Sequence, residues 1–112
     1  MNKDLFSSEE SQDLSKFVED YNWREAFNFS THGGITDVMR IVAMDDGEND
    51  GPNWIGVFEM KNGTFVFLSA GCDYTGWDCR AGGRSEVYKT EKAAIQGLGD
   101  DERYRLKLKM VY

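Results

Sequence analysis

The residue types with the greatest chemical potential gather in one short segment, from Gly71 to Gly83. It holds both cysteines of the chain, one of its three tryptophans and four of its twelve glycines. A thiolate is a nucleophile and a metal ligand, and an aromatic ring beside carboxylates suits the recognition of a protein. Binding or chemistry is therefore expected here first.

The two cysteines, Cys72 and Cys79, are seven positions apart. Zinc sites use four ligands with closer cysteine spacing, so a metal would need Asp73, Asp78 or His32 as well. A disulfide across the loop is sterically possible, but thiols in the cytosol are mostly reduced. A reactive thiol needs a nearby cation, and the arginine after Cys79 is the adjacent candidate. The sequence predicts two free, largely buried thiols, with these two cysteines as weak metal candidates and no cofactor.

The residues between the cysteines have two interpretations. The run Asp73-Tyr74-Thr75-Gly76-Trp77-Asp78 could form a recognition tip, with rigid aromatic area beside hydrogen-bonding groups. Alternatively, its Asp and Thr satisfy the loop backbone while Trp77 fills the core.

An acidic, turn-rich segment runs from Asp45 to Asn53 and contains the only proline. Its residues 46–51 resemble the start of a calcium loop, but Val57 occupies the twelfth position, where a bidentate Glu is required. Neither a nucleophile motif nor a phosphate-binding loop is present in the sequence. The paired acids of the chain lie in turn or cap contexts, so no acid–base pair is indicated. We expect no enzymatic activity.

A β-hairpin positions both loops. The strand-like runs Trp54–Met60 and Thr64–Ala70 flank Lys61-Asn62-Gly63, and Asn-Gly is the strongest short-range hairpin signal. A two-residue turn would place Phe58 opposite Phe67. Both faces of the hairpin are largely apolar, which predicts central strands covered on both sides. The acidic segment and the cysteine loop leave the same end of this hairpin, so they should lie side by side.

The remaining segments predict a sheet with helices packed on it. We expect an amphipathic helix over about Ser8–Tyr21, which is capped by Ser7 and has Leu14, Phe17, Val18 and Tyr21 on one face. A short helical piece should follow over Trp23–Phe29. Strands are expected over Thr36–Met44 and Ser85–Lys89, a helix over Thr90–Leu98 that is closed by Gly99, and the start of a further helix at Asp100. The tail from Tyr104 alternates apolar and basic residues, which favours a strand with one basic face, although its residue types favour helix. The predicted fold class is α+β, with a mostly antiparallel sheet of three to five strands.

Composition limits the class of partner. The 112 residues suit a single domain, with residues 1–6 frayed. No apolar run approaches the roughly 20 residues of a spanning helix, and the start lacks a secretory pattern, so a cytoplasmic protein without membrane contact is expected. The net charge is −7, and residues 1–60 hold 13 acids against 4 bases. Direct nucleic-acid binding is disfavoured, whereas a basic protein surface is a suitable partner; acidity that serves only solubility is the alternative.

Some of these motifs resemble a known group. The run Gly47 to Trp54, the hairpin, the run Ser69 to Cys79 and the triplet Ala81-Gly82-Gly83 are similar to a small uncharacterised protein family of phage and bacterial genomes. The resemblance covers roughly residues 46–106. It implies a phage or prophage setting and no particular activity.

The function expected from the sequence is that of a phage- or prophage-type accessory protein that binds a bacterial host protein. In a more specific version, it inhibits a host nucleic-acid-binding or defence factor. The expected contact residues lie in the two loops: Glu48, Asn49, Asp50, Asp73, Tyr74, Trp77 and Asp78. The alternatives are a small-ligand or metal-binding protein that uses the Cys72–Cys79 loop with Asp50, and a toxin-neutralising immunity protein.

Overall fold

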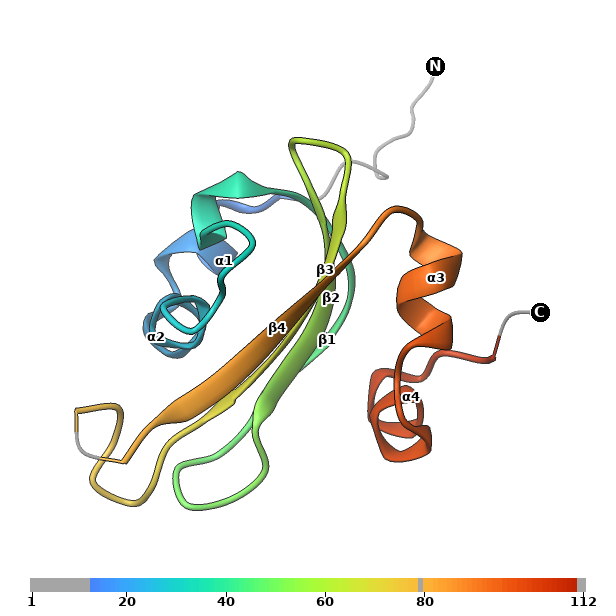
Figure 1. Cartoon of the computed structure of the whole chain (residues 1–112). Helices are drawn as coiled ribbons and strands as arrows, with labels where there is room; N and C mark the ends of the chain where they lie inside the picture. Colours follow the sequence, from blue (N-terminus) through green and yellow to red (C-terminus); the bar gives the residue numbers. More distant parts are fainter. Residues whose placement is uncertain (1–12, 79, 111–112) are drawn as a thin grey trace.

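The computed structural model describes residues 13–78 and 80–110. Four antiparallel strands form one sheet in the order β1-β2-β3-β4, so each strand pairs with its neighbour in sequence. The strands are β1 (Val38–Asp45), β2 (Trp54–Met60), β3 (Phe65–Gly71) and β4 (Gly82–Tyr88). The helices are α1 (Ser15–Glu19) and α2 (Tyr21–Phe27) on one face of the sheet, and α3 (Glu91–Gln96) and α4 (Asp100–Leu106) on the other (Figure 1). The predicted α+β class is confirmed.

The sheet separates two apolar cores, as expected for a hairpin with two apolar faces. On the side of α1 and α2, the buried ring of Phe58 lies 5.1–5.6 Å from the rings of Phe17, Trp23 and Phe27. The other core joins the sheet to α3 and α4 and consists of Ile55, Val57, Phe67, Ala94, Leu98 and Leu106. Because rings and aliphatic chains cover both faces, β2 and β3 are fixed in place at the centre of the molecule.

The hairpin lies where it was predicted, but its register differs by one residue. Phe58 pairs with Val66, and Phe67 faces the opposite core, so the predicted Phe58–Phe67 pair is wrong. The turn contains three residues because Gly63, with a φ of +91°, donates its N–H to the carbonyl of Met60 at 2.9 Å. A type I turn followed by a left-handed glycine is the usual three-residue hairpin loop. A shift of one residue exchanges the faces of the whole strand.

The N-terminal helix is shorter than the predicted Ser8–Tyr21. Residues before 13, including the predicted Ser7 cap and the frayed residues 1–6, lie outside the described part of the chain. The chain bends at Asp20, whose ψ is 121° and whose carboxylate accepts the N–H of Trp23 at 3.0 Å. This bond caps a new helix, α2, and leaves Tyr21 63% exposed instead of on the apolar face.

The tail is helical up to Leu106, so the predicted strand from Tyr104 is wrong. Lys107 ends α4 in the left-handed conformation, with a φ of 58°. Leu106 is buried against the sheet, whereas Arg105 turns to the carboxylate of Asp45 at 2.8 Å. Arg103 donates to the carbonyl of Leu98 at 2.5 Å. The predicted basic face therefore does not form, because its arginines have separate partners; residues 111–112 lie outside the description.

The other predicted elements are present with different bounds. A 3-10 turn, η1 (Ile35–Asp37), precedes β1. Strand β4 begins at Gly82, which is three residues before the predicted start. Helix α3 is capped by Thr90, as predicted, since its hydroxyl accepts the N–H of Ala93 at 3.0 Å. That helix ends at Gln96 with Gly97 as its C-cap, so the predicted closure by Gly99 is wrong; Gly99 is the N-cap of α4.

Candidate functional site

The two singled-out loops lie side by side at one end of the sheet, as predicted from the hairpin (Figure 1). The loop between β1 and β2 covers residues 46–53, and the loop between β3 and β4 covers residues 72–81. The N–H of Asp50 donates to the carbonyl of Cys72 at 2.9 Å, and the side-chain amide of Asn53 donates to the hydroxyl of Ser69 at 3.1 Å. We call these two loops together the acidic end.

Glycines allow close packing at two points of the acidic end, one between Gly71 and the side chain of Asn53, and one between Gly47 and the backbone of its own loop. A Cβ atom on Gly71 would lie 2.2 Å from Oδ1 of Asn53, and one on Gly47 would lie 2.3 Å from the carbonyl oxygen of Pro52. Within the first loop, Glu48 donates its N–H to that same carbonyl at 2.9 Å. A larger residue at Gly71 would push Asn53 away, and one at Gly47 would distort the 46–53 loop, since such contacts are shorter than atoms allow.

Cys72 is a free, buried thiol that packs inside the acidic end. Its Sγ lies 3.4 Å from Oδ1 of Asn49, in the geometry of a hydrogen bond. Burial raises the pKa of this thiol, and the neighbouring carboxylate of Asp73 raises it further. A nucleophilic cysteine requires a lowered pKa, so the environment of Cys72 disfavours thiolate chemistry. The other cysteine, Cys79, lies outside the described residues.

Trp77 belongs to the core and not to the exposed surface. Its side chain is 8% exposed, and its ring lies 5.1 Å from that of Trp54. Its Nε1–H donates to Oδ1 of Asn22 in α2 at 3.0 Å. The sequence allowed recognition or packing for this ring, and the structure shows packing. In the same way, Trp23 donates to the carboxylate of Asp46 at 2.8 Å and anchors the other loop.

The outer surface of the acidic end combines one aromatic ring with carboxylates. Tyr74 is 79% exposed at the tip of its loop. Glu48, Asn49, Asp50 and Asp78 are also exposed, while Asp73 is partly covered. Of the predicted contact residues, all except Trp77 therefore reach this surface.

Asp73 has a local structural role. Its carboxylate accepts hydrogen bonds from the N–H and the hydroxyl of Thr75, and its carbonyl accepts the N–H of Gly76 at 3.0 Å. The bond from the Thr75 hydroxyl is the main reason that the pKa of Asp73 is lowered. Asp73 is thus ionised at neutral pH, and it holds the turn that presents Tyr74.

The charge of this surface is one-sided. It carries five carboxylates and one guanidinium: Asp46, Glu48, Asp50, Asp73, Asp78 and Arg80. Within residues 13–78 and 80–110, the ion pairs of the protein lie elsewhere and none involves these carboxylates. Two cations offset part of this charge: Arg80 helps to lower the pKa of Asp73, and the guanidinium of Arg105 donates to the carbonyl of Asp46 at 3.3 Å. The surface keeps a net negative charge that can attract a partner of opposite sign.

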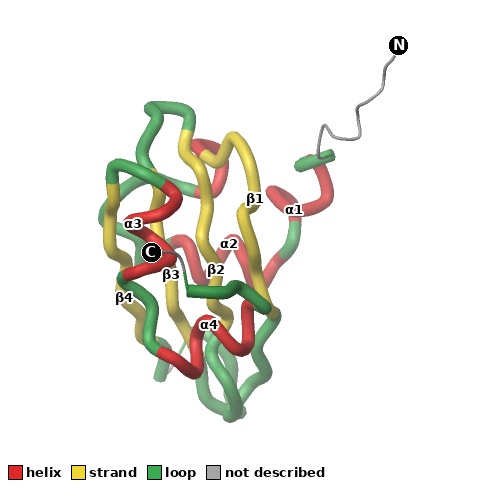
Figure 2. Tube along the Cα trace, turned by 90° about the vertical axis from the view of Figure 1, so that its right-hand side faces the viewer, coloured by secondary structure: helices red, strands yellow, loops and turns green. Residues whose placement is uncertain are grey.

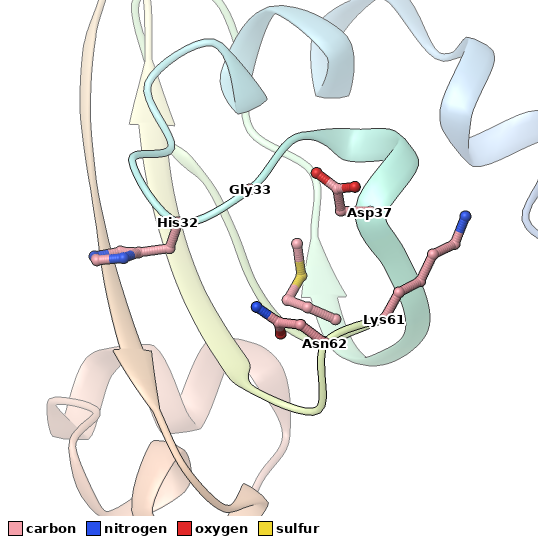
Figure 3. A pocket seen from close by; sticks show the side chains of 6 residues that line it. His32, Gly33, Asp37, Lys61 and Asn62 are labelled. Atoms are coloured by element: carbon pink, nitrogen blue, oxygen red, sulfur yellow. The ribbon is translucent and has the colours of Figure 1, made fainter.

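The described residues offer little support for the alternative of a metal or small-ligand site. Among the described residues, no group of three or more His, Cys, Asp or Glu side chains is placed to hold a metal ion. A cavity of about 430 Å³ lies at the opposite end of the sheet, beside the 61–63 turn (Figure 3). The polar ends of His32 and Lys61 point away from each other there, and the carboxylate of Asp37 accepts the N–H of Gly34 at 2.9 Å. A specific ligand site needs converging polar groups, which this cavity lacks.

Comparison with models of protein families, with curated proteins and with solved structures finds no match for this chain. Within the described residues, no helix is both long enough and apolar enough to cross a membrane.

Sequence reasoning missed the residues that anchor the acidic end. Asn22 lies 55 positions before Trp77, and Trp23 lies 23 positions before Asp46. No local pattern connects such distant residues. The one available signal was the presence of two tryptophans near loop segments, because a buried indole N–H needs an acceptor.

Proposed function

We propose that this protein is a non-enzymatic accessory protein that binds a basic surface of another protein through its acidic end. The observation that carries the proposal is the exposed ring of Tyr74 among carboxylates, none of which forms an ion pair within the described part of the chain. Aromatic residues supply much of the binding energy at protein interfaces, and a one-signed surface steers an oppositely charged partner.

Internal hydrogen bonds at three points of the acidic end support this proposal. The carboxylate of Asp46, the turn at Asp73 and the ring of Trp77 are all held by hydrogen bonds within the protein. A preorganised surface loses little conformational entropy on binding. Binding through Tyr74 also costs little side-chain conformational entropy, because this side chain has only two rotatable angles.

The kind of partner follows from the charge. A surface of this sign would compete with nucleic acid for a basic site, because phosphates and carboxylates bind the same lysines and arginines. We therefore propose a bacterial nucleic-acid-binding or defence factor as the partner, in the cytoplasm of a host cell, with the protein acting as a phage- or prophage-type inhibitor. An immunity protein that neutralises a basic toxin would use the same surface.

The test begins with capture of partners from a bacterial lysate on the wild-type protein and on the triple variant E48Q/D50N/D78N. A partner retained by the wild type alone is then purified and its affinity measured by calorimetry. Three exposed ion pairs at about 0.5 kcal/mol each amount to roughly 1.5 kcal/mol, which is about a tenfold loss of affinity. Tyr74→Ala should weaken binding at least as much if the ring is central.

The matched control is E19Q/E25Q/D101N, which removes the same charge from surfaces outside the acidic end. It should bind like the wild type. Binding should also weaken as salt rises, because the Debye length falls from about 10 Å at 0.1 M to about 3 Å at 1 M. An affinity that is unchanged by salt or by the triple variant would refute the proposal. Competition by duplex DNA distinguishes a nucleic-acid-binding partner from a toxin.

A further inference from the structure

The two edge strands of the sheet differ in how they are protected. The edge strand β1 contains two register irregularities, one between Val38 and Arg40 and one between Ile41 and Ala43. The edge strand β4 pairs with β3 over seven consecutive residues without any irregularity. Irregular pairing bends an edge away from further strands, whereas a regular edge can accept one.

The outer side of β4 is open along the backbone. Figure 2 shows β4 and β1 at opposite margins of the sheet, behind α3 and α4. Thr31 contacts β4, but its N–H donates to the side-chain oxygen of Ser85 at 2.9 Å and not to the backbone. Within the described residues, no hydrogen bond from another segment reaches the backbone of β4 on this side. Its outward N–H and C=O groups are thus available for pairing.

The side chains of β4 are complementary to a second copy of the same strand. Arg84 and Glu86 lie on one face, are about half exposed, and have charged groups 3.5 Å apart. If two β4 strands pair antiparallel about a two-fold axis at Ser85, Arg84 of each copy lies opposite Glu86 of the other. The same register places Gly83 opposite Val87. In a two-fold symmetric dimer of this kind, both copies contribute the same surface to the interface.

Shape supports the same register. Val87 is 43% exposed. In the paired strands it would lie opposite Gly83, which has no side chain and therefore leaves room for the methyl groups of Val87. At the end of the strand, Gly82 has open space at its Cβ position and would face Tyr88. Antiparallel pairing also points the two acidic ends in opposite directions, which keeps their charges apart.

We propose that this protein forms a homodimer in which the β4 strands of two copies pair antiparallel and join the two sheets into one. The occupant of the β4 edge is thus a second copy of this chain. The interface lies outside the carboxylates of the acidic end, so this proposal is independent of the proposed function.

The experiment is a charge exchange, read by light scattering and sedimentation over a range of concentrations. The wild type should have twice the 12.8 kDa mass of one chain. Arg84→Glu places Glu opposite Glu, and Glu86→Arg places Arg opposite Arg, so each variant alone should shift to monomer. An equimolar mixture of the two variants restores both opposite-charge pairs and should return to dimer. The double variant R84E/E86R should also be dimeric.

The controls separate pairing from folding. Arg24→Glu and Glu19→Arg make the same charge changes on α2 and α1 and should leave the dimer intact. Arg84 also contacts Glu102 at 2.9 Å and lies 4.9 Å from the ring centre of Phe67, so its variant is checked by circular dichroism. If it does not fold, Glu86→Arg decides, because it leaves the contacts of Arg84 with Glu102 and Phe67 in place. A wild type that is monomeric at every concentration, or a dimer that neither charge change weakens, would overturn the proposal.

Discussion

Replacement of Trp77 by Ala should destabilise the protein strongly although the residue lies in a loop. The ring is 8% exposed and lies 5.1 Å from Trp54 and 6.3 Å from Phe29. Truncation of a buried Trp to Ala costs about 3–5 kcal/mol, because transfer energy is lost and a cavity remains. The lost bond to Asn22 adds little, since that amide is only partly buried and can bind water.

The assay is urea unfolding followed by circular dichroism. Small domains have a total stability of about 5–15 kcal/mol, so Trp77→Ala should remove a large part of it and lower the midpoint without a change in slope. Tyr74→Ala is the matched control, because it removes an exposed ring from the same loop and should change stability by less than about 0.5 kcal/mol. Trp77→Phe keeps an aromatic ring and should fall between them.

Equal midpoints for Trp77→Ala and Tyr74→Ala would refute the assignment of Trp77 to the core. The stabilities of these two variants also decide how a loss of partner binding is interpreted. A loss of partner binding in Trp77→Ala would report a disordered loop, whereas a loss in Tyr74→Ala with unchanged stability reports a contact.

Three further predictions concern single contacts. Gly71→Ala should destabilise the protein by about 1–3 kcal/mol in thermal unfolding, because its Cβ would lie 2.2 Å from Asn53, and adding Asn53→Ala should recover part of the loss. In the Cys79→Ser variant, Cys72 should react with a thiol reagent at pH 8 much more slowly than free cysteine does, because burial raises the pKa of its thiol and lowers the thiolate fraction. A reaction rate equal to that of the urea-unfolded protein would contradict this. Thr90→Ala should cost about 1 kcal/mol through loss of the α3 cap, measured against Thr90→Ser as the control that keeps the cap.

The sequence predicted strand positions better than strand register. The Asn-Gly pair and the flanking apolar runs located the hairpin, because both residues tolerate a positive φ. In the structure only Gly63 of the pair has a positive φ, and this difference adds a residue to the turn. Phe58 and Phe67 thereby move to opposite faces. Register therefore depended on one backbone angle that the residue types left open.

The strand predicted for the tail is wrong for a different reason. Tyr104, Leu106 and Leu108 alternate with Arg105 and Lys107 as in a strand. Helix α4 has only seven residues, which is too short for a helical period to be distinguished from alternation. Tertiary contacts decide the outcome, since Leu106 enters the core and Arg105 pairs with Asp45.

The candidate site could be predicted in part. Hairpin connectivity was sufficient to place the 46–53 and 72–81 loops together, because antiparallel neighbours share their ends. It could not show which residues of those loops face outward. That choice depends on acceptors in α2, such as Asn22 for Trp77, and sequence spacing contains no information about them.

The order of the strands has a consequence for the speed of folding. Every strand pairs with its neighbour in the chain, and no connection between paired strands exceeds ten residues. The entropy lost on closing a loop grows only with the logarithm of its length, so each of these closures is inexpensive. Folding rates of small domains rise as contacts become more local in sequence. The sheet should therefore assemble hairpin by hairpin, and its main refolding phase in stopped-flow measurements should be faster than that of a sandwich of similar size.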